Sequence, residues 1–242
     1  MHRNNFWPDA AGNRLFKNII MVAARKKNRP DIIGILDLQG GVHEHWDHLQ
    51  RLGIAARRVK QKSDFDDLAG LIIPGGESSC ISRLLDIFGI KEPLLNAYNR
   101  GMKIWGTCAG AILLAQKVVG ESACLGLIDI EIERNGFGSQ LDSFKSEALV
   151  AAVSAEPIPL TFIRAPKILS AGKEVNILLK IDDYIAMAES ENILVTVFHP
   201  ELTGCVAFHR YFGIKCGLKP RAGDLIDRQW NNSSWTRLAR IA

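Results

Sequence analysis

The feature that most constrains the fold is a repeated order of segments: a short apolar run, a turn that contains glycine, and residues with helical spacing. The first run covers 31–38, and a helix is expected after it over 43–52. Uninterrupted, β-branched runs are typical of strands buried on both faces of a parallel sheet. Further strands are expected at 55–59, 70–73, 102–105, 128–132, 160–163, 176–179 and 194–198, and further helices at 78–88 and 111–116. This order predicts an α/β fold with a mostly parallel sheet flanked by helices.

No repeat or low-complexity linker divides the sequence, so one domain is expected over 31–216. A chain of 242 residues is long enough to bury a core of that size. Residues 1–30 are expected to be a flexible N-terminal extension, with a transit peptide or a translated upstream region as alternatives, and 217–242 a C-terminal tail. No apolar run reaches the length of a membrane-spanning helix. The net charge of +4 is mild and much of its excess lies at the two ends, so no nucleic-acid partner is expected.

The five cysteines are odd in number and include no pair or run at zinc-binding spacing. A disulfide framework and a structural zinc site are therefore not expected. A reducing, cytoplasmic compartment is expected instead. His45 and His48 share one expected helix at a spacing that could hold a metal, but no third ligand lies nearby in the sequence. We expect no metal site. The cysteines other than Cys108 are expected to act as small apolar residues, and they are Cys80, Cys124, Cys205 and Cys216.

Four unusual segments follow strands of the expected sheet. They contain Gln39, the Gly75-Gly76 pair, Cys108 and His199. Ligand sites in open α/β sheets lie outside the carboxyl ends of the strands. We therefore expect these four segments to share one edge of the sheet and to form a site there.

Cys108 stands at the centre of Gly106-Thr107-Cys108-Ala109-Gly110, which has the form of a strand–turn–helix elbow around a nucleophile. The flanking glycines allow a tight turn that directs one side chain out of the sheet edge. A thiol at the start of a helix is favoured as thiolate by the backbone dipole and the free N–H groups. The alternative is a small buried cysteine in a glycine-rich turn. The combination of both glycines with the strand and helix favours the nucleophile.

His199 and Glu201 follow the strand expected at 194–198, with Pro200 between them. A thiol nucleophile needs a base near neutral pH, and imidazole suits that task. In an extended segment, a carboxylate two residues on points to the same side and can orient the imidazole. The alternative is a surface histidine and glutamate near a turn. Together with the elbow, the pair predicts a Cys108–His199–Glu201 triad.

Backbone N–H groups and two arginines complete the expected site. The Gly76 and Ala109 N–H groups are candidate donors to an oxyanion, whereas a simple helix N-cap with Ser78 is the alternative for the glycine turn. Arg134 and Arg164 are candidates to hold the carboxylate of a free amino acid, because Arg binds carboxylates in a bidentate manner. Exposed structural arginines are the alternative.

Taken in order, these segments resemble the class I glutamine amidotransferases, with their flavodoxin-like three-layer fold. Within them they resemble the glutaminase subunits of pyridoxal 5′-phosphate synthase. The matching segments extend over about residues 32 to 212 and include Leu38-Gln39-Gly40, Glu44-His45, Pro74-Gly75-Gly76-Glu77-Ser78, the elbow, Arg134-Asn135, Phe137-Gly138-Ser139-Gln140, Phe162-Ile163-Arg164-Ala165-Pro166 and Phe198-His199-Pro200-Glu201. The elbow and the His-Pro-Glu segment are shared by many glutaminases. The segments that begin at Leu38, Pro74, Arg134 and Phe162 are more particular to the vitamin B6 branch.

The resemblance implies a glutaminase with the triad Cys108, His199 and Glu201. It places glutamine contacts on Gly76, Glu77, Ser78, Arg134, Ile163 and Arg164, and Gln39 near the oxyanion peptide at the face that meets the synthase subunit. No metal or organic cofactor is implied. Asp37 and Gly136 depart from the family pattern. Asp37 lies next to the partner-facing loop and therefore concerns the interface and not the triad.

The sequence thus predicts an enzyme that hydrolyses glutamine and passes the ammonia to a synthase subunit in a hetero-oligomer. Two alternatives remain at this stage. One is a glutaminase or cysteine hydrolase of another pathway with the same elbow. The other is a non-catalytic module that scaffolds the synthase, which a complete set of triad residues argues against.

Overall fold

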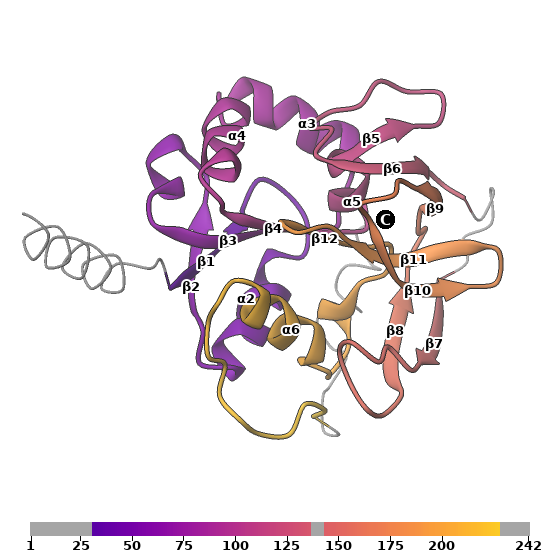
Figure 1. The fold of residues 1–242 in the computed structure, drawn as a ribbon. Coiled ribbons are helices and arrows are strands. Elements are labelled where there is room, and N and C mark those ends of the chain that lie inside the picture. Colours follow the sequence, from indigo (N-terminus) through magenta and orange to yellow (C-terminus); the bar gives the residue numbers. More distant parts are fainter. Residues whose placement is uncertain (1–30, 137–142, 228–242) are drawn as a thin grey trace, which may run out of the picture. The chain divides into compact units, whose positions relative to one another are not determined.

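The computed structural model of the protein describes residues 31–136 and 143–227 (Figure 1). The extension expected at 1–30, the motif residues 137–140 and the end of the expected tail from 228 lie outside the described residues. No helix within the described ranges combines the length and the apolar character needed to cross a bilayer.

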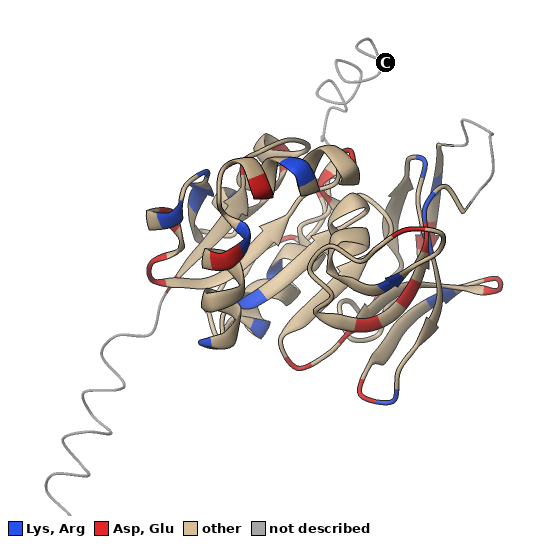
Figure 2. Ribbon diagram, turned by 90° about the horizontal axis from the view of Figure 1, so that it is seen from above, with Lys and Arg blue, Asp and Glu red and all other residues tan. Residues whose placement is uncertain are grey.

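Five parallel strands form one half of the main sheet, in the order β2-β1-β3-β4-β12. They are β1 (Ile32–Leu36), β2 (Ala55–Val59), β3 (Leu68–Ile73), β4 (Lys103–Thr107) and β12 (Ile193–Thr196). Every residue of β3 and β12 is buried, because helices cover both faces of this half. Central strands of this kind carry few charged side chains, and the charged residues lie on helices, loops and outer strands (Figure 2).

Helices lie on both faces of the parallel half (Figure 1). On one face are α2 (Val42–Arg51) and α6 (Ala207–Lys215), and on the other are α3 (Ser78–Ile87), α4 (Lys91–Asn99) and α5 (Ala109–Leu114). A short 3-10 helix, η1 (Lys62–Phe65), joins β2 to β3, and a second one, η2 (Pro200–Leu202), follows β12. The three layers confirm the predicted fold class.

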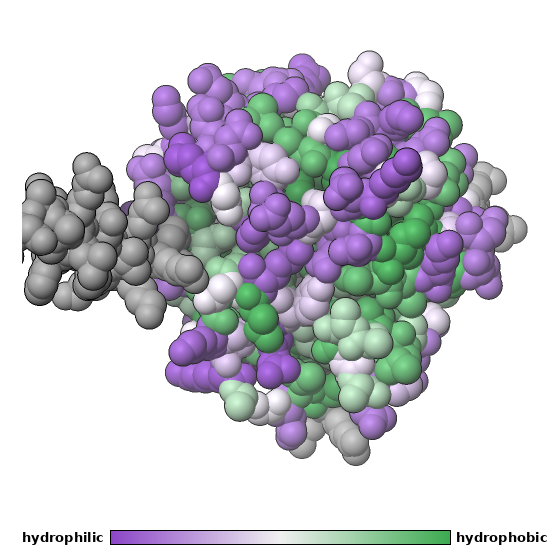
Figure 3. Space-filling view, in the orientation of Figure 1, coloured by the Kyte–Doolittle hydropathy of each residue, from purple (hydrophilic) through white to green (hydrophobic). Residues whose placement is uncertain are grey.

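The other half of the main sheet is mostly antiparallel. Beyond β12 the order continues β11-β9-β6-β5, and β10 pairs with β11. These strands are β5 (Ala115–Val118), β6 (Ile128–Glu133), β9 (Lys167–Ala171), β10 (Asn176–Ile181) and β11 (Tyr184–Glu189). A separate hairpin-like sheet pairs β7 (Phe144–Ala148) with β8 (Ile158–Phe162). Hydrophobic residues reach the surface over this half, including the exposed Ile177 of β10 (Figure 3).

The sequence prediction missed α4, α6 and the strands β5, β7, β9 and β11. It also extended the helix after the elbow to residue 116, whereas α5 ends at Leu114 and the chain becomes β5 at Ala115. Pairing with β6 decides this change, because it provides hydrogen-bond partners for β5 that the local sequence does not indicate. In β11, Ala186, Met187 and Ala188 favour helices in isolation, but burial in the middle of the sheet outweighs that preference.

Residues beyond the expected domain end at 216 return to the core. The Arg221 N–H donates to the Leu52 carbonyl at 2.8 Å, at the end of α2. Near the start of α6, the Val206 N–H donates to Leu225 at 2.8 Å and the Asp227 N–H donates to Gly204 at 2.9 Å. The described part of the expected tail therefore connects α2 to the start of α6.

Candidate active site

Strand register brings the expected segments to one edge of the sheet. Ile73 of β3 lies opposite Gly106 of β4, and Thr107 of β4 lies opposite Thr196 of β12. These three strands therefore end side by side, as expected for parallel strands. The Cys108 N–H donates to the Thr196 carbonyl at 2.8 Å and joins the elbow to the last strand.

The elbow at Cys108 is a strained turn. Cys108 has φ 48° and ψ −105°, a conformation that side chains with a Cβ rarely adopt, and only 7% of the residue is exposed. Glycine is required on both sides. A Cβ on Gly106 would lie 2.5 Å from the backbone of Gly110, and a Cβ on Gly110 would lie 2.1 Å from the Ile73 carbonyl oxygen. The absence of these side chains lets α5 pack directly against β3 and β4.

His199 and Glu201 form the expected pair. The His199 Nδ1 lies 2.8 Å from the Glu201 Oε1, and Glu201 is 1% exposed. The expected extended segment is wrong, because Pro200 starts the 3-10 helix η2 and Glu201 reaches back through a turn. Proline favours this start, since its fixed φ suits the first turn of a helix.

The charges of His199 and Glu201 stabilise each other. Burial alone would lower the pKa of His199, but Cys108 and Glu201 beside it hold this pKa well above its ordinary value. Burial would raise the pKa of Glu201, yet His45 and His199 hold it at about 2. Glu201 is therefore ionised at neutral pH, and the imidazole of His199 is favoured in its protonated form beside the sulfur of Cys108.

The turn at Gly75 fills the space between Cys108 and His199. A Cβ on Gly75 would lie 2.3 Å from the His199 Cε1 and 3.2 Å from the Cys108 Cβ. The Gly75 N–H donates to the Thr107 Oγ1 at 2.9 Å, and the Gly41 N–H donates to the Gly75 carbonyl at 3.3 Å. Both groups of this residue are thus held by neighbouring segments.

Gln39 lies beside the same turn, as the resemblance implied. Its Oε1 accepts from the Glu77 N–H at 3.0 Å and would lie 3.2 Å from a Cβ on Gly76. The Gly76 and Ala109 N–H groups stay predicted oxyanion donors. Ala109 starts α5 directly after Cys108 and is 1% exposed.

Two of the predicted glutamine contacts are paired with each other. The Arg134 guanidinium binds Glu77 and also Glu121, at 2.5 and 3.0 Å. Glu77 also forms the N-cap of α3, because its carboxylate accepts from the N–H groups of Ser79 and Cys80. The alternative prediction of an N-cap at Ser78 is therefore wrong. The helix does have an N-cap, but it is Glu77, and Ser78 is the first residue of the helix and is buried. The Ser79 hydroxyl and these N–H groups lower the pKa of Glu77, against burial, which would raise it.

Ile163 and Arg164 directly follow β8, which reaches the site through the His199 N–H bond to the Thr161 carbonyl at 2.8 Å. Arg164 is exposed and has φ 43°, a second strained residue close in sequence to the site. Both therefore lie on a segment that is attached to His199. Their contact with glutamine stays a prediction.

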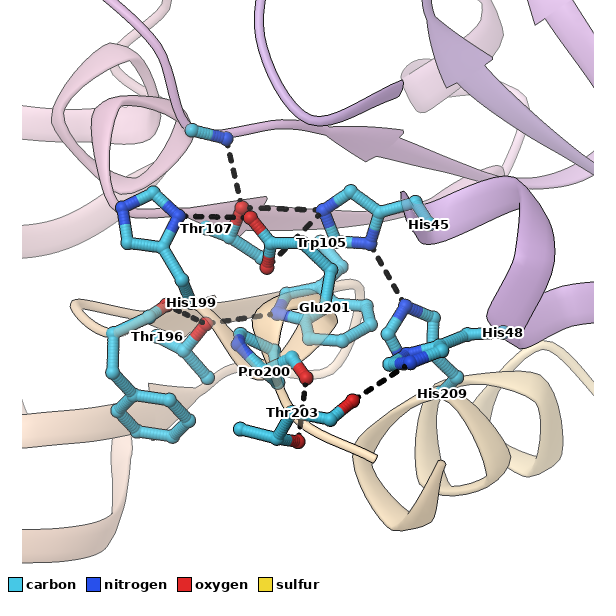
Figure 4. Close-up of polar contacts among 12 residues, drawn as sticks. His45, His48, Trp105, Thr107, Thr196, His199, Pro200, Glu201, Thr203 and His209 are labelled. Atoms are coloured by element: carbon cyan, nitrogen blue, oxygen red, sulfur yellow. Dashed lines mark hydrogen bonds and ion pairs between the residues drawn. The ribbon is translucent and has the colours of Figure 1, made fainter. Parts of the chain in front are cut away.

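The sequence analysis missed a cluster of three fully buried histidines next to the predicted triad. His45 and His48 lie on α2, and His209 comes from α6 (Figure 4). The His45 Nε2 is 3.6 Å from the Glu201 Oε2. One signal was present, because His45 and His48 share the buried face of α2 with Val42 and Leu49. His209 could not be connected with them from sequence spacing.

No group of three or more His, Cys, Asp and Glu side chains within the described ranges could hold a metal ion. The cysteines other than Cys108 differ in burial. Cys205 is buried, Cys124 and Cys216 are half-buried, and Cys80 is exposed. It lies on the outer side of the first turn of α3.

Comparison with known proteins identifies the family of this chain. The SNO glutamine amidotransferase family matches residues 35–217. The chain belongs to this family. It is 59% identical over 218 residues to the pyridoxal 5′-phosphate synthase subunit PdxT of Syntrophus aciditrophicus. The match covers 89% of this chain and 97% of that protein. It is 46% identical over 182 residues to the subunit of the same name from Ruminiclostridium cellulolyticum, covering 74% and 96%.

A solved structure of a glutamine amidotransferase is also similar to the chain. It superposes with a TM-score of 0.73 at 38% sequence identity and covers 77% of this chain and 99% of that one. The family resemblance predicted from the motifs is confirmed by these matches.

Proposed function

We propose that this chain is the glutaminase subunit of a pyridoxal 5′-phosphate synthase, with Cys108 as nucleophile and His199 as its acid and base. Membership of a glutamine amidotransferase family and the names of its relatives support the reaction and the pathway. One observation carries the choice of residues. The strained Cys108 elbow and the His199–Glu201 pair meet at one edge of the sheet, with the Gly75 turn between them.

The proposed reaction has two halves. The Cys108 thiolate attacks the side-chain amide carbon of glutamine, and His199 donates its proton to the departing ammonia. Water then attacks the thioester while His199 takes a proton from it, and glutamate leaves. Glu201 orients His199 and stabilises its charge throughout, and the Gly76 and Ala109 N–H groups are the proposed donors to both oxyanions.

The proposed partner is a synthase subunit that uses the ammonia. Free ammonia is mostly ammonium at neutral pH and is then a poor nucleophile, which favours its transfer inside a hetero-oligomer. Gln39, beside the turn and in contact with Glu77, is the proposed link to the partner face. We expect the isolated subunit to be poorly active until the partner docks. A cytoplasmic location stays a prediction from the sequence.

The test is glutamate release from glutamine, measured with and without a pyridoxal 5′-phosphate synthase subunit. Cys108→Ala should abolish turnover, whereas Cys80→Ala, which removes an exposed thiol, should not change it. Activity that requires both Cys108 and the partner supports the proposal. Partner-independent activity would retain the glutaminase and contradict the pathway, and no Cys108-dependent activity under either condition would favour the scaffold alternative.

A further inference from the structure

A continuous series of buried polar contacts leads from the Gly75 turn to the far side of the triad. The Gly75 N–H donates to the Thr107 Oγ1 at 2.9 Å, and this oxygen lies 3.4 Å from the His45 Nε2. The His45 Nδ1 lies 2.8 Å from the His209 Nε2 (Figure 4). We call Thr107 and the three histidines, His45, His48 and His209, the buried histidine network.

The network ends on a backbone carbonyl. The His48 Nδ1 is 3.1 Å from the His209 Nδ1, and the His48 Nε2 is 3.1 Å from the Thr203 oxygen. A carbonyl only accepts, so the His48 Nε2 must carry a proton. Burial, with nearby cationic groups, lowers the pKa of His48 to about 3 and that of His209 well below its ordinary value, so both rings are neutral at neutral pH.

The proton on the His48 Nε2 determines the direction of every other hydrogen bond in the network. With a proton on Nε2, the neutral His48 accepts at Nδ1, and His209 must donate from its own Nδ1. The Nε2 of neutral His209 then accepts from the His45 Nδ1–H. A neutral His45 therefore has a bare Nε2, which accepts from the Thr107 hydroxyl. The Thr107 oxygen keeps its lone pairs for the Gly75 N–H, and every group in the series has a partner.

We propose that Thr107 and His45 are positioning residues of the glutaminase site: neutral His45 directs the Thr107 hydroxyl, which holds the Gly75 N–H and thereby the turn that carries the Gly76 N–H. This inference concerns the positioning of the turn and rests on the proposed function. Thr107 and His45 do not touch the reacting atoms. They act through the Gly75–Gly76 peptide, whose carbonyl is fixed on the other side by the Gly41 N–H.

The surroundings of His45 make this arrangement sensitive to acid. Within the described ranges it faces Glu201 and His199 from the segment after β12, His209 from α6, and His48 on its own helix, with Arg51 close to the latter two. Burial lowers the pKa of His45, against the attraction of Glu201. Among the residues that the structure describes, the Glu201 Oε2 has no hydrogen-bond partner. A proton on the His45 Nε2 would turn it into a donor to this oxygen, at 3.6 Å, and remove the acceptor of Thr107.

The first experiment reads the tautomers directly and needs no activity. Long-range 1H–15N correlation spectra of the 15N-labelled full chain at pH 7 distinguish Nδ1–H, Nε2–H and imidazolium rings. We expect His45 and His209 as neutral Nδ1–H tautomers and His48 as the neutral Nε2–H tautomer. His45 found as Nε2–H or as imidazolium at this pH would overturn the proposal.

The second experiment tests the function of the hydroxyl with the synthase subunit present. Thr107→Val keeps the shape but leaves the Gly75 N–H without an acceptor, and Thr107→Ser keeps the hydroxyl. Because an oxyanion donor acts mainly in the transition state, Thr107→Val should lower kcat about tenfold or more with KM for glutamine changed by less than about twofold. Thr107→Ser should retain most of kcat. Equal losses in both variants, or none in either, would overturn the proposal.

A control distinguishes failure of the positioning proposal from failure of the proposed function. Alkylation of Cys108 by iodoacetamide, followed by peptide mass spectrometry, does not pass through an oxyanion and should proceed in Thr107→Val within about threefold of the unmodified chain. A slower alkylation would show that the variant disturbs the nucleophile and not the turn, which contradicts the proposal. Absence of glutamine turnover in the unmodified chain would contradict the proposed function, whereas the tautomer spectra would still decide on the network.

Discussion

Gly75 occupies a position where even a methyl group has no room. Its added Cβ would lie 2.3 Å from the His199 ring. We expect Gly75→Ala to displace the imidazole and lower kcat/KM about 100-fold or more, because small displacements of a catalytic group are costly. The check is glutamate release with the synthase subunit, beside Gly223→Ala, where a Cβ would meet nothing within 4 Å. Activity of Gly75→Ala equal to that control would contradict the described geometry.

Glu201 determines how far the activity extends to alkaline pH. Its negative charge helps to keep the pKa of His199 above the ordinary value, so the imidazolium persists to higher pH. Glu201→Gln removes this charge, the pKa of His199 falls, and the alkaline limb of kcat/KM should move to lower pH. We expect kcat to fall about tenfold or more as well. A pH profile with an unshifted alkaline limb would be inconsistent with this coupling, and the exposed Glu92→Gln on α4 serves as control.

At the scale of the element, Glu77 caps α3 while it binds Arg134. The carboxylate accepts from two N–H groups of the first turn, which would otherwise have no partner within the helix. Glu77→Ala should therefore lower the free energy of unfolding by about 0.5–2 kcal/mol. Glu121→Ala removes another partner of Arg134 but no cap, and it should cost about 0–1 kcal/mol. Urea denaturation of both variants measures the difference, and equal losses would contradict the cap.

The elements that the sequence predicted share one property, which is that their signal is local. The runs of β1 and β3 are apolar throughout, and the elbow has a glycine on each side of Cys108 and its neighbours. In β7, by contrast, Phe144 to Ala148 alternates between half-buried and exposed residues, with a stacked Phe144–Phe162 pair holding it to β8. Such a strand depends on its partner, and the run of β7 alone does not show that β8 pairs with it.

At the scale of the whole molecule, the predicted triad could be found because each member lies in a recognisable segment at a strand end. The buried histidine network could not, because His45 and His209 are separated by 164 residues and meet only when α2 packs beside α6. The same limit applies to the Arg134–Glu77 pair, which joins the turn directly after β6 to the start of α3. Local sequence shows that a residue is unusual, whereas packing decides which charge or ring it meets.

The packing of α2 beside α6 should in turn depend on residues 220–227. This segment hydrogen-bonds to Leu52 at the end of α2 and to the Gly204–Val206 region before α6, through three backbone bonds. A chain that ends at Lys219 retains the Leu218 N–H bond to Gly213 but loses these three bonds. At roughly 0.5–1.5 kcal/mol for each bond, it should be less stable than a chain that ends at Asp227 by about 1.5–4.5 kcal/mol. Urea denaturation of the two chains measures the difference. The shorter chain should also lose kcat, because α2 and α6 carry the histidines behind the Gly75 turn. Equal stability of the two would mean that α2 and α6 hold together without this segment.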